Sequence, residues 1–340
     1  MEATYYQSNG GSLIRPFLLS TQVSPRGYSL PLQRRISDFG ADMAFRQVNK
    51  KLQEHYGITV PDSSIRLITL HHANQIKQRQ EKQLGTLQST PKAYIISETD
   101  GSMVPIVTPK KRAENEKIDR RKRKVLSYRE ARLTLAHEQG VIKPIFSATL
   151  GDVKTTGQHV LHCVRAVGVN EKTSIHCVGD GAVWIADQMD KQFGSKATYL
   201  IDFYHLCEYL SAAASSCAPG QEKAWLKQQK ELLKASCSSQ VLLALKPYVE
   251  PSSAPEAEAP VRACYRYMNN RPKQLDYKTA IANGLPIGSG ELESAHRYII
   301  QKRLKIAGAW WLEDTAEIML AIRVNRENNQ WQEYWGDNAA

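Results

Sequence analysis

The sequence predicts an α/β fold in which helices flank and interrupt one five-stranded mixed sheet. Two observations predict it. Over residues 92–205, short apolar runs bounded by turn residues alternate with amphipathic stretches, which is the order of strands and helices in an α/β core. The chain has 340 residues, of which 42% are hydrophobic, so it can bury a sizeable core.

The part before the sheet predicts helices. Residues 1–35 are rich in Gly, Ser, Pro and Arg and indicate an irregular segment. From Ile36, apolar residues recur at spacings of four or five, which predicts a helix that ends before Gly57. Asp62, or the serine after it, can cap a second helix. The region 36–90 can therefore be a DNA-reading helix-turn-helix or a plain helical hairpin, and both readings stay open.

Five runs predict the strands of the sheet. They are expected at 92–97, 103–107, 128–136, 174–178 and 197–202. Asp100 and Gly101 form a turn signal between the first two, and the first three strands can pair as an antiparallel meander. A helix separates the fourth strand from the fifth, so these two should run parallel. This is the order of the RNase H-like fold, and several other mixed α/β folds are compatible with it.

The helices divide the chain further. Amphipathic stretches predict helices at 158–167 and 182–193, between the later strands. Residues 206–283 are predicted to be mostly helical, apart from a Pro-, Ala- and Glu-rich loop. A last helical region follows, with a break expected near Gly308.

The charge balance favours a nucleic-acid partner. The net charge is +11 and the pI is about 9.3, and excess positive charge attracts polyanions. Residues 110–124 hold nine basic and three acidic side chains, which indicates either DNA-backbone contact or a solvated loop. The six cysteines include no C-x-x-C pair, so no zinc site is predicted. No apolar run is long enough for a membrane span, and we expect a soluble protein of a reducing, intracellular compartment.

Two aspartates are candidates for metal binding. Asp100 follows the first predicted strand and Asp180 the fourth, and these strands should be neighbours. Two adjacent carboxylates repel each other, and a divalent cation such as Mg²⁺ or Mn²⁺ removes that penalty. The competing interpretation is that each Asp-Gly pair only forms a turn. A third carboxylate is sought at 286–298, where Glu291 and Glu293 lie about 200° apart around a helix and cannot both face one site.

Several segments together resemble one known family. The segments are "DGSMVP", "GDGAVWI", "YLIDFYHLCEYL", "GLPIGSGELESAHRYIIQKRLKIAGAWW" and "AIRVNRENNQW". In this order they resemble the DDE transposases of bacterial insertion sequences, and the resemblance extends over about 300 residues. It implies an RNase H-like catalytic core, formed by 91–205 and 284–335, with a helical insertion at 206–283 before the last carboxylate.

The resemblance also implies site residues and an activity. The family's two aspartates fall on Asp100 and Asp180, and its Gly-Ser-Gly-x-x-Glu-Ser pattern selects Glu293 as the third ligand. Asp202 and His205 match an Asp-x-x-His motif: Asp202 is the rival second ligand, and His205 is either its structural partner or a catalytic group. The implied activity is DNA cleavage and strand transfer with Mg²⁺, or Mn²⁺ as a substitute.

The implied partners are transposon ends and target DNA, bound by a homodimer or larger assembly in the bacterial cytoplasm. The residues expected to contact DNA are Lys110, Lys111, Arg112, Arg120, Arg121, Arg297, Lys302, Arg303, Lys305 and Trp310. Trp311 is expected in the core. The family pattern would include a longer amino-terminal part with paired cysteines, so a truncated or split transposase stays open. The alternatives are a nuclease without strand transfer and a transposase-derived DNA-binding protein.

Overall fold

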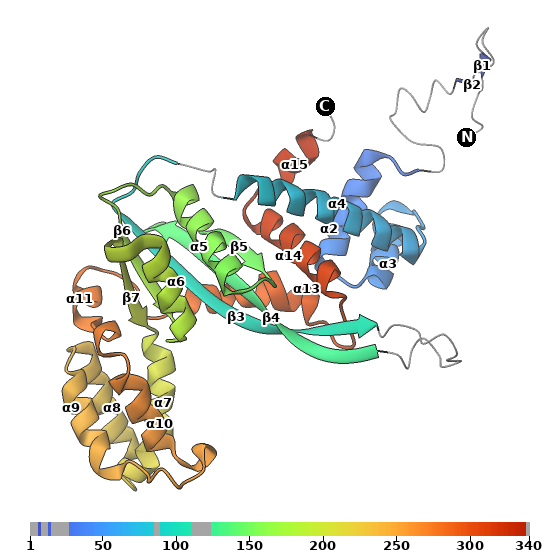
Figure 1. The fold of residues 1–340 in the computed structure, drawn as a ribbon. Helices are drawn as coiled ribbons and strands as arrows, with labels where there is room; N and C mark the ends of the chain where they lie inside the picture. Colours follow the sequence, from blue (N-terminus) through green and yellow to red (C-terminus); the bar gives the residue numbers. More distant parts are fainter. Residues whose placement is uncertain (1–5, 8–12, 15–26, 85–88, 110–123, 338–340) are drawn as a thin grey trace. The chain divides into compact units, whose positions relative to one another are not determined.

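A computed structural model describes residues 6–7, 13–14, 27–84, 89–109 and 124–337 (Figure 1). The chain divides into two compact units. Unit 1 comprises Met1–Lys82, Val104–Arg129 and Arg297–Ala340, and unit 2 comprises Gln83–Met103 and Glu130–His296. Each unit is described by itself.

A five-stranded mixed sheet confirms the predicted RNase H-like α/β class. Its strands are β3 (Tyr94–Pro109), β4 (Lys124–Glu138), β5 (Ile145–Thr149), β6 (Ser174–Gly179) and β7 (Ala197–Ile201). They are arranged in the order β5-β4-β3-β6-β7. The pairs β3–β6 and β6–β7 are parallel, and β4–β5 is antiparallel. The sequence analysis expected the first strand to lie next to the strand that precedes Asp180, and the pairing of β3 with β6 confirms this.

Two strand predictions were wrong. The expected hairpin at 92–107 is one continuous strand, β3, because each of its flanks pairs with other parts of the chain. The hydroxyl of Ser97, for example, donates to the carbonyl of Leu135 on β4. The sequence analysis also missed β5, whose five residues pair with β4 from Arg132 to Ala136. A short strand without a turn signal of its own gives little local pattern.

Two helices cover one face of the sheet in unit 2. They are α5 (Val153–Val167) and α6 (Val183–Phe193), and Figure 1 shows them side by side. Their apolar residues pack with Ile95, Ile175 and Cys177, which all lie on the same face of β3 and β6. Helix α5 begins five residues earlier than predicted, because the side chain of Asp152 accepts a hydrogen bond from the backbone N–H of Thr155.

The predicted helical insertion follows β7. Its helices are α7 (Phe203–Cys217), α8 (Glu222–Lys234), α9 (Ser238–Leu245), α10 (Pro260–Asn269) and α11 (Tyr277–Ala282). One apolar cluster joins them to β7. Short 3₁₀ turns lie at Gly194–Lys196, Lys246–Tyr248, Glu256–Glu258 and Pro272–Gln274. The predicted Pro-rich loop accordingly lies between α9 and α10.

The amino-terminal helices belong to unit 1. They are α2 (Leu30–Asp42), α3 (Phe45–Tyr56) and α4 (Asp62–Gln83), and two short strands, β1 (Tyr6–Gln7) and β2 (Leu13–Ile14), precede them. The single helix predicted from Ile36 is thus two helices. The backbone is extended at Met43, where the apolar spacing lengthens to five residues. Gly57 ends α3 with a left-handed conformation, as predicted.

The late helical region is broken more often than predicted. It contains α12 (Gly290–Ala295), a π-helix (His296–Gln301), α13 (Lys302–Leu304), α14 (Glu313–Glu327) and α15 (Trp331–Asp337). The expected break near Gly308 is present, and the positive φ of this glycine belongs to it. A second break at Asn329, also at positive φ, separates α14 from α15.

The cysteines are free. Five of them are buried, and only Cys237, at the start of α9, is partly exposed. No helix within the described ranges combines the length and the apolar character that crossing a membrane requires.

Candidate active site at one level of three parallel strands

The candidate site lies in unit 2, where β3, β6 and β7 run parallel. The register pairs Glu98 with Val178, so Asp100 on β3 lies level with Asp180, which directly follows β6. The next pair of strands matches Gly179 with Ile201, which brings Asp202 to the same level. Three aspartates, one on β3 and the others directly after β6 and β7, therefore share one level of the sheet.

The environment of Asp100 disfavours its negative charge. Crowding by protein, which displaces water, raises the pKa of this carboxyl group to about 6. A hydrogen bond from the backbone N–H of Gly101 opposes that shift, whereas the charges of Asp180 and Glu130 add to it. Three carboxyl groups thus influence one another here, an arrangement that a hard divalent cation would stabilise.

His296 lies beside Asp100 and was missed by the sequence analysis. Its Nε2 atom is 3.6 Å from Oδ2 of Asp100, and the side chain is almost fully buried. His296 follows Glu293 by three residues, so the two side chains project from the same side of the helix. That spacing was a usable signal, because it pairs an ionisable residue with the predicted third ligand.

The two glutamates of α12 have different surroundings. Glu293 is exposed, one turn before His296. Glu291 projects elsewhere, and its Oε2 is 3.0 Å from Nε2 of His137 on β4. The neighbouring carboxylate supports the charged form of His137, whose pKa is raised despite the opposing effect of burial. The expectation that the glutamates cannot face one site agrees with this geometry.

Both carboxylate oxygens of Asp202 accept hydrogen bonds. Its Oδ1 caps α7 by accepting from the backbone N–H groups of Tyr204 and His205, at 2.7 and 3.0 Å. Its Oδ2 accepts from the backbone N–H and the hydroxyl of Ser289, at 2.7 and 2.5 Å. The side chain is buried, at 7% exposed. Asp202 therefore joins the start of α7 to the Gly-Ser-Gly turn before α12.

The ring of His205 does not bond to Asp202, which contacts only its backbone. Instead, Nδ1 of His205 lies 3.5 Å from Glu208, and the ring packs edge-on against Tyr209 and Tyr267. The expected pairing of Asp202 and His205 is thus a helix cap rather than a side-chain pair.

The helical insertion supports the loop that carries Asp180. The Tyr267 hydroxyl donates to the Asp180 carbonyl at 2.5 Å, and Nε of Arg271 donates to the Gly181 carbonyl at 2.8 Å. The Gly181 N–H donates to the Tyr199 hydroxyl. The Asp180 side chain accepts from the N–H of Ala182 within the loop. These supporting residues were not predicted, because no local pattern links α10 to a loop about 90 residues earlier.

Glu98 connects β3 to α12. Its Oε2 accepts from the backbone N–H of Leu292 at 2.9 Å, and only 2% of the residue is exposed. Burial raises the pKa of Glu98 to about 7. A glutamate inside an apolar strand, two residues before Asp100, was a signal that the sequence analysis did not use.

A family comparison bears on these residues. One family model matches residues 164–334, which is half of the chain. The chain belongs to the uncharacterised protein family UPF0236. The UPF0236 match includes Asp180, Asp202, Glu293 and His296 but begins after Asp100. No curated protein matches the sequence.

The predicted metal ligands are Asp100, which precedes the UPF0236 match, and Asp180 and Glu293, which lie within it. Over the part of the chain that the structure describes, no three His, Cys, Asp or Glu side chains are grouped closely enough to hold a metal ion. The predicted ligands are nevertheless all carboxylates, and the pKa of Asp100 is raised mainly by burial, with a smaller contribution from the charges of Asp180 and Glu130. This donor set fits Mg²⁺ or Mn²⁺ better than Zn²⁺.

The predicted DNA-contact residues differ in whether the structure describes them and in how exposed they are. Five of them lie outside the described residues: Lys110, Lys111, Arg112, Arg120 and Arg121. Arg297, Lys302 and Lys305 are exposed in unit 1, and Lys302 lies 3.5 Å from Asp42. Arg303 is only 2% exposed. Trp310 is 38% exposed, whereas Trp311 is buried, as expected.

Proposed function

We propose that this chain is a DDE-type transposase that cleaves DNA strands and joins them to target DNA. The observation that carries the proposal is the level register of Asp100 and Asp180 on adjacent parallel strands. The helix of Glu293 is tied to the same strand by Glu98 and by the proximity of His296 to Asp100. The ordered transposase-like motifs of the sequence and its net charge of +11 add support.

Asp100, Asp180 and Glu293 would hold the divalent cations. When bound, such ions activate a water or a DNA 3′-hydroxyl and stabilise the leaving oxygen. The chain itself would keep the three carboxylates in position. The insertion holds the Asp180 loop through Tyr267 and Arg271, and Asp202 holds the turn before α12.

The experiment uses Asp100→Asn, Asp180→Asn and Glu293→Gln in the full chain, with DNA that carries candidate inverted repeats. Each change removes a ligand charge but keeps the size of the side chain, so we expect loss of cleavage with DNA binding retained. Glu171→Gln is the matched control, because Glu171 is an exposed glutamate in the turn before β6, at the opposite end of that strand from Asp180. A wild-type cleavage rate in any of the three variants would remove that residue from the site.

Metal restoration after chelation separates the alternatives. Mg²⁺ and Mn²⁺ should each restore activity, whereas Ca²⁺ should permit binding with little chemistry. Cleaved DNA without strand-transfer products would favour a hydrolytic nuclease. Binding without cleavage under every metal, unaffected by the three substitutions, would favour a transposase-derived DNA-binding protein. Activity with Zn²⁺ alone would contradict the carboxylate site.

A further inference from the structure

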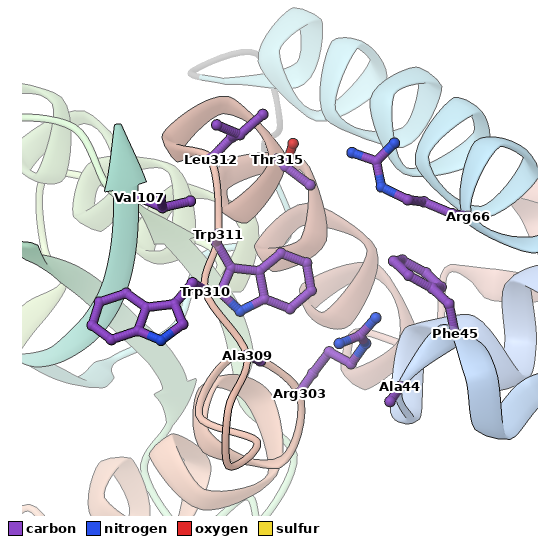
Figure 2. A pocket seen from close by; sticks show the side chains of 10 residues that line it. All are labelled: Ala44, Phe45, Arg66, Val107, Arg303, Ala309, Trp310, Trp311, Leu312 and Thr315. Carbon is purple, nitrogen blue, oxygen red and sulfur yellow. The ribbon is translucent and has the colours of Figure 1, made fainter. Parts of the chain in front are cut away.

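A second candidate site lies in unit 1, in a cavity of about 290 Å³. Figure 2 shows side chains from α3, α4, β3 and the segment around Trp311 surrounding this pocket. Its lining includes two arginines, Arg66 and Arg303, and the aromatic rings of Phe45, Trp310 and Trp311. No acidic residue is among the described residues that line it.

Arg303 is a buried cation with unused hydrogen-bonding capacity. Its guanidinium stacks between the rings of Phe45 and Trp311, with its carbon 4.7 Å from each ring centroid. Its Nε donates to the carbonyl of Gly40, but Nη2 has no hydrogen-bond partner among the described residues. Burial lowers the pKa of Arg303 to about 10, so the group remains charged at neutral pH.

A buried guanidinium that leaves one of its N–H groups unpaired is costly. Asp42 attracts Arg303 but forms its ion pairs with Arg323, Arg326 and Lys302, and the charge of Arg323 disfavours the charged form of Arg303. The second arginine of the pocket, Arg66, is exposed and forms no ion pair with any residue in the described ranges. Two guanidinium groups without carboxylate partners therefore line one small cavity.

We propose that this pocket binds the phosphate group of a nucleotide, with Arg303 and Arg66 as the charged partners. Planar guanidinium groups match the geometry of phosphate oxygens, and aromatic walls accommodate the attached nucleoside. The phosphate can come from a DNA strand or from a free nucleotide, and the chemistry of recognition is the same. Every lining residue belongs to unit 1, whereas the candidate catalytic residues belong to unit 2. A strand phosphate in this pocket deepens the proposed transposase function and rests on it, whereas a free nucleotide is a ligand beyond that function.

The test is titration calorimetry of the full chain with four probes. They are deoxyadenosine monophosphate, deoxyadenosine, inorganic phosphate and a short single-stranded oligonucleotide. The monophosphate should bind at least about tenfold more tightly than the nucleoside, which lacks the charged group. Arg66→Gln should weaken that binding about tenfold. Arg46→Gln is the matched control, because Arg46 is an exposed arginine of α3 that does not line the pocket.

Arg303→Lys gives a second measurement, since it keeps the charge but removes the planar fork. Circular dichroism shows whether that variant is folded, and Arg66→Gln tests the proposal independently, because its residue is exposed. Binding of the oligonucleotide alone would assign the phosphate to a strand, and binding of the monophosphate alone would assign it to a small molecule. Equal binding of nucleoside and monophosphate, equal losses in Arg66→Gln and Arg46→Gln, or no binding of any probe would overturn the proposal. Asp100→Asn should bind the probes normally, which separates this site from the proposed activity.

Discussion

Gly181 has a backbone conformation and a close contact that favour glycine at this position of the candidate site. Its φ is +80°, a backbone conformation that residues with a side chain rarely adopt. A Cβ added here would lie 2.5 Å from the Tyr267 hydroxyl. That hydroxyl supports the loop of Asp180 through its hydrogen bond to the Asp180 carbonyl. The glycine therefore permits the insertion to approach the loop closely.

Gly181→Ala should lower the free energy of unfolding by about 2 kcal/mol, because strain and a steric clash add together. Gly194→Ala is the control: Gly194 also has positive φ, but nothing lies within 4 Å of its added Cβ. Urea unfolding of both variants measures the difference. Equal losses would show that the approach of Tyr267 imposes no constraint.

His72 makes the stability of unit 1 depend on pH. The residue is 2% exposed, and burial lowers the pKa of its ring to about 4. The folded state therefore favours the neutral ring. The contribution of this preference to the free energy of unfolding is fully present above pH 6.5, the pKa of the ring in the unfolded chain. It should be lost as the pH falls from 6.5 to 4, by about 3 kcal/mol in all.

Chemical unfolding at several pH values measures this loss, and His72→Gln should flatten the profile in that window. His55→Gln, which changes an exposed histidine of α3, should leave the profile as it is in the wild type. An unchanged slope in His72→Gln would assign the acid sensitivity to other groups.

At the scale of elements, α12 is a six-residue helix held by contacts from outside itself. Glu98 from β3 caps Leu292, Asp202 from the start of α7 holds Ser289, and His137 from β4 pairs with Glu291. So short a helix has little intrinsic stability. Its position, and that of Glu293, depends on these three contacts.

Asp202→Asn should lower the free energy of unfolding by about 2 kcal/mol or more, since an amide nitrogen would replace one of the oxygens that accept from N–H and O–H groups. Mn²⁺ affinity, followed by electron paramagnetic resonance, should stay near that of the wild type if Asp202 is a positioning residue. Asp152→Asn, at the cap of α5, is the control for losing a single capping bond. A steep loss of Mn²⁺ affinity with normal stability would instead make Asp202 a ligand.

The sequence predicted the elements better than their connections. Strands β6 and β7 and the intervening helix were predicted closely, because each combines an apolar run with a clear boundary. The hairpin prediction failed at Asp100, since an Asp-Gly pair specifies a turn only where its two flanks can pair with each other. The level of Asp100 and Asp180 followed from strand adjacency, whereas Tyr267, Arg271 and Glu98 depend on contacts between distant segments that local pattern does not contain.

At the scale of the whole molecule, the net charge of +11 predicts salt-sensitive binding to DNA. Substituting Lys110, Lys111, Arg112, Arg120 and Arg121 by Ala should flatten the dependence of log affinity on log salt, by about 0.9 for each phosphate that the protein no longer neutralises. The measurement is binding to non-specific duplex over a range of salt concentrations. The control removes five exposed lysines of the insertion instead: Lys223, Lys227, Lys246, Lys273 and Lys278. Similar slopes for both variants would assign the basic run to a solvated loop.

The burial of five of the six cysteines has a practical consequence for spectroscopy. A thiol-reactive dye should modify Cys237 first in the native protein, because the other sulfur atoms are shielded. Burial also raises the pKa of thiols such as Cys207, which lowers their reactivity further. A fluorophore at Cys237 would thus report on the insertion without any engineered cysteine, and the appearance of further labelled sites would mark the opening of the interior.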